Sequence, residues 1–125
     1  MPMSTIDVLA GFPSPAADHL ETRLDLTRHL VKHPSATFLA RVEGDSMIGA
    51  GIYHGDLLVV DRSLTASSGR VVVAVVNGEH TVKRYYQEGG QQWLAPENPN
   101  YKPLELTEGL DWSLWGVVTA SVHVH

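Results

Sequence analysis

The sequence predicts a mainly β, antiparallel fold, and three observations support this prediction. Short segments rich in valine and aromatic residues recur along most of the 125-residue chain. Glycine, asparagine, serine and proline bound these segments, which favours strands over buried helices. Asn77-Gly78 lies between two such segments. Because both residues tolerate a positive φ, this pair predicts a tight hairpin turn.

Two elements precede the predicted strands. We expect residues 1–18 to form an extended N-terminal arm, because Pro13 and Pro15 impose extended backbone and disfavour a helix interior. One short helix is predicted after the arm, with Asp25 as its N-cap, apolar residues at helical spacing and Pro34 at its end.

Residues 19–125 are predicted to form one domain, since the chain is of single-domain length and shows no internal repeat. The predicted strands of this domain are SATFLARVEG, DLLVVDR, RVVVAVV, TVKRYYQ, QQWLA and LWGVVTASVHV. The segment APENPNYKP carries three prolines, so we expect a surface connection or a sheet edge there.

Composition excludes several classes of function. The chain has no cysteine, which rules out disulfides, thiolate metal sites and thiol nucleophiles. Its net charge is −5 and its nine basic residues are scattered, so direct binding of DNA is not expected. The first residues lack the pattern of a secretion signal, and no apolar run is long enough to span a bilayer. We therefore expect an unexported, cytoplasmic protein that needs no cofactor.

Two residue types offer catalytic chemistry. Ser46, in the segment GDSM, would need a base within hydrogen-bond reach to act as a nucleophile, and none of the seven histidines has a carboxylate at informative spacing, although a triad assembled in space stays open. Lys83 lies in a strand pattern on the same face as Thr81 and Tyr85. Burial can lower the pKa of a lysine enough for it to act as a base. From these residues alone, the simpler interpretation is favoured, in which Ser46 is a turn residue and Lys83 is a solvated charge on an exposed strand face.

The sequence end VHVH places His123 and His125 on one face of the last predicted strand. Two histidines without a third ligand do not make a metal site, so no metal is expected there.

Several ordered motifs resemble the serine–lysine self-cleaving family of LexA-type repressors and UmuD-type mutagenesis proteins. The motifs are GDSM, GDLLVVD and TVKR, together with GFPSPA, HPSAT, SLTAS, NPNYKP and WGVVT, and they run from Gly11 almost to the end of the chain. The separation of 37 residues between Ser46 and Lys83 also suits the family. UmuD is the better match, because only 45 residues precede Ser46 and a repressor domain of several helices does not fit there.

This resemblance implies a LexA/signal-peptidase-like antiparallel β fold and a set of site residues. Ser46 would be the nucleophile and Lys83 the neutral general base. The backbone N–H groups of Asp45 and Ser46 would form the oxyanion hole, and the bond between Ala10 and Gly11 would be cleaved. His54 stands where relatives often have an acidic residue, and we interpret it as a turn variant.

The resemblance also implies partners. A RecA filament on single-stranded DNA would promote self-cleavage, and the shortened protein, a homodimer, would serve an error-prone Y-family DNA polymerase. Two other functions stay open. One is a β interaction module that binds a polymerase or another partner without cutting itself, which the short arm of ten residues before the bond favours. The other is a peptidase that acts on other proteins.

Overall fold

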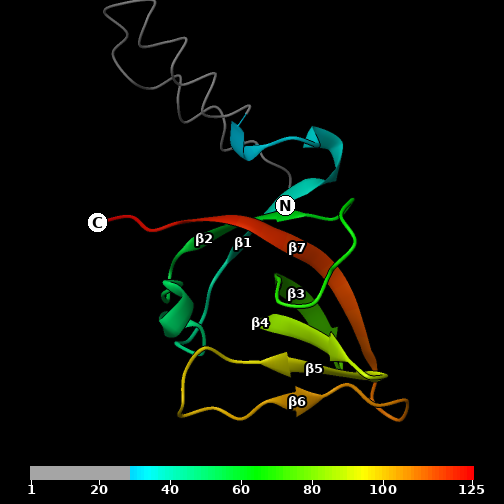
Figure 1. Ribbon diagram of the computed structural model, residues 1–125. Coiled ribbons are helices and arrows are strands. Elements are labelled where there is room, and N and C mark those ends of the chain that lie inside the picture. The colour runs from blue at the N-terminus through cyan, green and yellow to red at the C-terminus, as the bar shows by residue number, and fades with distance from the viewer. Residues whose placement is uncertain (1–28) are drawn as a thin grey trace, which may run out of the picture.

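The structure, a computed structural model, describes residues 29–125 (Figure 1). The predicted arm, the Ala10-Gly11 bond and most of the predicted short helix lie outside the described residues. His29 and Leu30 are helical, and the helical conformation ends there. The expectation that the helix runs to Pro34 is wrong, because Pro34 instead begins a separate 3-10 helix, η2 (Pro34–Ala36), where its missing N–H leaves no hydrogen bond unmade.

The predicted antiparallel β fold is confirmed. Residues 29–125 form one seven-stranded sheet with the order β1-β2-β7-β3-β4-β5-β6, in which all neighbouring strands are antiparallel. The strands are β1 (Thr37–Arg41), β2 (Leu57–Asp61), β3 (Val71–Val76), β4 (Glu79–Glu88), β5 (Gln91–Ala95), β6 (Leu104–Glu105) and β7 (Trp112–Val122), and a 3-10 helix, η3 (Ile48–Ala50), lies between β1 and β2. The two-residue strand β6 was not predicted, because it is too short to show an alternating pattern.

The predicted hairpin turn at Asn77-Gly78 is also confirmed. Val76 pairs with Glu79, so the two strands are joined by two residues with φ of 50° and 83°. Two residues with positive φ give the turn a twist that matches the twist of the strands it connects. This hairpin fixes the register of β4 on β3 and therefore the face on which each β4 side chain lies.

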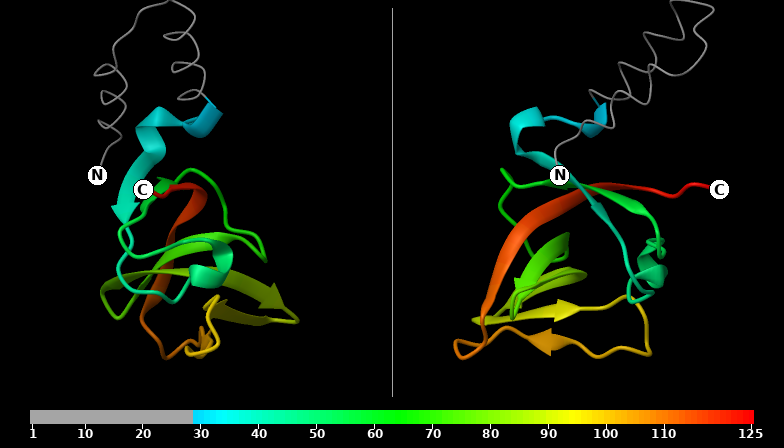
Figure 2. Two further views of the ribbon diagram at one scale, coloured as in Figure 1. Left: turned by 90° about the vertical axis from the view of Figure 1, so that its left-hand side faces the viewer. Right: turned by 180° about the vertical axis from the view of Figure 1, so that it is seen from behind.

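Strand β7 lies inside the curved sheet and joins two parts of it, the strands β1 and β2 on one side and the strands β3 to β6 on the other (Figures 1 and 2). It pairs with β2 on one side and with β3 on the other. The register shifts between Val59 and Val60 and again between Val73 and Ala74. Such bulges increase the local twist of a strand, and the sheet accordingly curls instead of lying flat.

The curved sheet buries residues on both of its faces, since consecutive side chains of a strand point to opposite sides. Val73 belongs to a first core cluster with Val42, Met47, Ile52, Leu58 and Val60. Its neighbour Val72 belongs to a second cluster with Ala74, Tyr85, Leu94 and Leu106. The first cluster is the one that supports the segment around Ser46.

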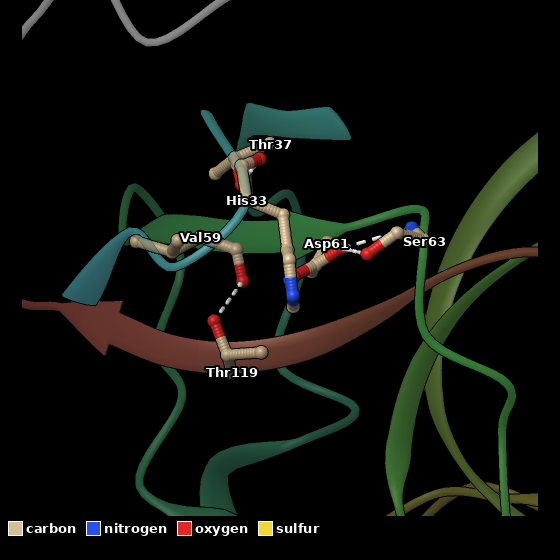
Figure 3. Close-up of polar contacts among 6 residues, drawn as sticks. All are labelled: His33, Thr37, Val59, Asp61, Ser63 and Thr119. Atoms are coloured by element: carbon tan, nitrogen blue, oxygen red, sulfur yellow. Dashed lines mark hydrogen bonds and ion pairs between the residues drawn. The ribbon is translucent and has the colours of Figure 1, made fainter. Parts of the chain in front are cut away.

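Polar contacts of His33 and Thr37 stabilise the segment that precedes β1 (Figure 3). The Nδ1 of His33 lies 2.5 Å from Oδ2 of the buried Asp61, and the other oxygen of Asp61 accepts hydrogen bonds from the N–H and hydroxyl groups of Ser63. The Thr37 hydroxyl donates to the carbonyl of His33 at 2.7 Å. Burial alone would raise the pKa of Asp61, but the hydrogen bonds from Ser63 and His33 outweigh it and lower that pKa.

Candidate active site

Ser46 lies in the turn after β1, and its neighbour anchors that turn. Met47 is only 1% exposed, so its side chain fixes the turn to the first core cluster. Gly44, with φ of +84°, begins the turn, and its N–H donates to Nδ1 of His54 at 3.0 Å. His54 thus orders the backbone next to Ser46, in agreement with its interpretation as a turn residue.

Lys83 reaches Ser46 from β4. The Nζ of Lys83 lies 2.9 Å from Oγ of Ser46, 2.9 Å from Oγ1 of Thr81 and 3.1 Å from the carbonyl oxygen of Val82. The fold therefore brings together two predicted site residues that are 37 positions apart in the chain. Thr81, which the strand pattern placed on the same face as Lys83, is a third member of the site.

The surroundings of Lys83 favour its neutral form. The side chain is half-buried, and burial lowers the pKa of the ammonium group below its ordinary value. A neutral amine has two N–H donors and one lone pair, and three polar atoms surround Nζ. The two N–H groups can donate to Thr81 and Val82, which leaves the lone pair for the hydroxyl proton of Ser46. When Lys83 is charged, the same three oxygen atoms can accept hydrogen bonds from the three N–H groups of its ammonium. The site can therefore accommodate Lys83 in both protonation states.

Ser46 and Lys83 share a cleft of about 290 Å³. Leu58, Val73 and Val82 contribute apolar side chains to it. Its other lining residues come from the end of β1, from the two residues that follow it and from the start of β4, and they are Ala40, Arg41, Val42, Glu43, His80 and Thr81. The cleft is thus bounded by extended backbone on two sides and contains both dyad side chains.

A loop after β5 holds the turn of Ser46 in place. Glu97 N–H donates to the carbonyl of Ser46 at 2.8 Å, and Gly49 N–H donates to the carbonyl of Glu97 at 2.7 Å. The side-chain amide of the buried Asn98 donates to the carbonyl of Asp45 at 2.9 Å. The prolines of this loop predicted only a surface connection or a sheet edge. The position of Asn98 between Pro96 and Pro99 is the one sequence signal that could have suggested a structural role, and the side chain is indeed buried.

The side chain of Asp45 also contacts the loop after β5. It accepts a hydrogen bond from the hydroxyl of Tyr101, which also raises the pKa of that tyrosine. The N–H groups of Asp45 and Ser46, the predicted oxyanion hole, donate no hydrogen bond to another residue within 29–125.

The two histidines at the end of the chain lie beyond β7, which ends at Val122, and not on a strand face as predicted. The ring of His123 lies 4.9 Å from that of His125 and also contacts the carboxylate of Asp56. Among residues 29–125, no three histidine or acidic side chains are grouped closely enough to hold a metal ion. In the same part of the chain, no helix combines the length and the hydrophobicity that a membrane span requires.

Comparison with known proteins is consistent with this geometry. Residues 2–119 match the family described as Peptidase S24-like. Protein SamA of Salmonella typhimurium is 44% identical over 122 residues, which are 98% of this chain and 84% of SamA. Protein MucA of Escherichia coli is 44% identical over 119 residues, 94% of this chain and 81% of MucA. A LexA repressor of Clostridium perfringens is 41% identical over 97 residues, 78% of this chain and 48% of the repressor.

A curved antiparallel sheet with a serine and a lysine in hydrogen-bond contact in a surface cleft is the arrangement of a serine–lysine peptidase. The chain belongs to the peptidase S24 family, the LexA/UmuD family of self-cleaving serine peptidases. Its similarity to SamA and MucA over nearly its whole length places it with the UmuD-like SOS mutagenesis proteins of that family.

Proposed function

We propose that the protein cleaves its own chain between Ala10 and Gly11, with Ser46 as the nucleophile and Lys83 as the general base. The observation that carries this proposal is the 2.9 Å contact between Lys83 Nζ and Ser46 Oγ inside the cleft. A base in hydrogen-bond contact is what a serine hydroxyl needs for attack near neutral pH.

The reaction proceeds in two steps. Neutral Lys83 takes the proton of Ser46, whose Oγ attacks the carbonyl carbon of Ala10. The N–H groups of Asp45 and Ser46 stabilise the negative oxygen that forms. The C–N bond then breaks, and the ammonium group of Lys83 gives its proton to the leaving amine of Gly11. Lys83 next activates a water molecule, which hydrolyses the ester between Ser46 and Ala10 and releases residues 1–10.

The shape of the cleft supports this substrate. A small residue before the scissile bond and a glycine after it let the chain approach a serine in a narrow cleft. Strand β1 stands at one end of the strand order, so its outer edge is free of pairing within residues 29–125. An extended segment such as IDVLA could pair there as an added strand. The 17 residues between Gly11 and His29 span at most about 60 Å, which is ample for this approach.

The partners follow from the resemblance to UmuD-like proteins. A RecA filament on single-stranded DNA stabilises the pose in which the arm occupies the cleft, and the shortened form serves a Y-family DNA polymerase in the cytoplasm. The protein acts as a homodimer, for which the edge strand β6, at the other end of the strand order, offers a pairing surface. Direct contact with DNA is not required, in keeping with the net charge of −5.

Intact-mass analysis tests the proposal. The purified protein is incubated at alkaline pH, with and without RecA filaments, alongside Ser46→Ala and Lys83→Ala. The expected result is loss of residues 1–10 from the parent and from neither variant. Dependence of the rate on protein concentration then separates cleavage within one chain from cleavage between chains. Absence of cleavage in every condition contradicts the proposal and favours the alternative function, a β module that binds a polymerase without cutting itself.

A further inference from the structure

Arg84 and Glu97 form an ion pair next to the candidate active site. The Nε of Arg84 lies 2.6 Å from Oε1 of Glu97, and both side chains are partly buried, at 27% and 34% exposure. The same guanidinium donates through Nη1 to the carbonyl of Gly69 at 2.7 Å. Two contacts of one planar group give Arg84 a fixed direction, and a charge-assisted hydrogen bond in a partly buried place is stronger than one in water.

Glu97 connects this ion pair to the nucleophile turn, which we define as residues 45–49. Its N–H donates to the carbonyl of Ser46, and its carbonyl accepts from Gly49. The fit is close, since a Cβ atom at Gly49 would lie 2.6 Å from the carbonyl oxygen of Glu97. The residue that binds Arg84 through its side chain therefore holds the nucleophile turn at Ser46 and at Gly49 through its backbone.

Arg84 follows Lys83 directly on β4. Consecutive residues of a strand point to opposite faces. Lys83 therefore supplies the proposed base on one face of β4, while Arg84, on the other face, supports the nucleophile turn through Glu97. Because Glu97 binds the backbone of Ser46, a shift of Glu97 would move the hydroxyl oxygen Oγ of Ser46 relative to Nζ of Lys83. Because misplacement by about 1 Å can reduce a rate 100-fold, catalysis is sensitive to such a shift.

We propose that Arg84 and Glu97 are positioning residues that hold the nucleophile turn at the correct distance from Lys83. This inference rests on the proposed self-cleavage for its kinetic test, but its structural test is independent of cleavage. Neither residue touches the reacting atoms. Their effect is on the position of Ser46.

The kinetic test compares self-cleavage of the parent with that of Arg84→Met and Glu97→Gln. Glu108→Gln is the matched control, since Glu108 is an exposed carboxylate in the turn between β6 and β7. We expect the first two variants to cleave at least tenfold more slowly at every pH, and the control to cleave within twofold of the parent. Circular dichroism and thermal unfolding establish that each variant is folded.

The structural test measures amide hydrogen exchange in the same variants on a Ser46→Ala background, where no cleavage occurs. We expect faster exchange at Gly49 and Glu97, whose N–H groups form the contacts described above, and unchanged exchange at Arg62, whose N–H donates to the carbonyl of Ala36 far from the pair. General destabilisation would instead accelerate exchange at all three positions.

Each combination of results decides the inference. Slow cleavage together with local loss of protection supports it. Cleavage at the parent rate, or protection of Gly49 and Glu97 as in the Ser46→Ala chain, overturns it. If the parent itself does not cleave, the proposed function fails, and hydrogen exchange alone then decides whether Arg84 and Glu97 hold the turn.

Discussion

Thr81 and Lys83 lie two residues apart on β4, and the Nζ of Lys83 donates to the Thr81 hydroxyl oxygen at 2.9 Å. Residues two apart on a strand share a face, so the backbone itself sets this contact. In the proposed mechanism, this contact holds the Lys83 amine at the position from which it accepts the proton of Ser46.

Thr81→Val should slow self-cleavage about tenfold. The substitution keeps the shape of the side chain but removes a hydrogen bond worth about 1–1.5 kcal/mol, and 1.4 kcal/mol corresponds to a factor of ten in rate. Thr81→Ser retains the hydroxyl and should cleave within a few-fold of the parent. Equal rates for the valine and serine variants, measured by intact mass over time, would contradict this role.

The rate of self-cleavage should rise with pH and reach a plateau below the ordinary pKa of lysine, about 10.4. The reason is that burial lowers the pKa of Lys83, so the neutral base becomes abundant at lower pH than for a solvated lysine. Rates measured from pH 6 to pH 11 without RecA test this. A rate independent of pH over that range would exclude Lys83 as the base.

Lys83 should reduce the stability of the fold at neutral pH. A lysine with a lower pKa in the folded state binds protons more weakly there than in the unfolded chain, so stability rises as pH increases from the folded to the unfolded value. On a Ser46→Ala background, Lys83→Met should therefore raise the melting temperature at pH 7, and the gain should shrink toward pH 10.5. Lys102→Met, at an exposed position, serves as the control and should change little.

Gly49→Ala should be far more damaging than Gly109→Ala. A Cβ at Gly49 would meet the backbone oxygen of Glu97 at 2.6 Å, whereas a Cβ at Gly109 would meet nothing within 4 Å. We expect the first variant to lose about 1–3 kcal/mol of stability, as overpacked sites do, and to cleave at least tenfold more slowly. Urea unfolding and cleavage assays on both variants provide the measurement. Similar stabilities and cleavage rates for the two variants would contradict a close fit between Gly49 and Glu97.

Asp61 should make the fold sensitive to acid. Because its pKa is lowered in the folded state, the stability it contributes is present above about pH 4, the unfolded value, and is lost as pH falls toward the folded value. Asp61→Asn should therefore cost about 1–3 kcal/mol at pH 6, and the cost should shrink near pH 3. Asp111→Asn, which replaces an exposed carboxylate, is the comparison in thermal unfolding across this range.

The sequence predicted the parts of the fold that depend on local pattern. The Asn77-Gly78 hairpin follows from the conformational freedom of two adjacent residues, and the strands from composition over a few positions. Ser46 and Lys83 were found through motifs and their spacing, and the fold then places them in contact. By contrast, the contact between Ser46 and Glu97 joins two loops 51 positions apart through backbone atoms, which carry no sequence signal.

The central position of β7 has a consequence for the order of events during synthesis. Ser46 is attached to the β1–β2 part of the sheet and Lys83 to the β3–β6 part, and β7 pairs with both. In chain order it is also the last strand within residues 29–125. A nascent chain whose β7 is still inside the ribosome lacks the strand that joins the two parts. Such a chain should be inert toward its own arm, and competence for the proposed cleavage should arise only once β7 has left the ribosome and paired with β2 and β3.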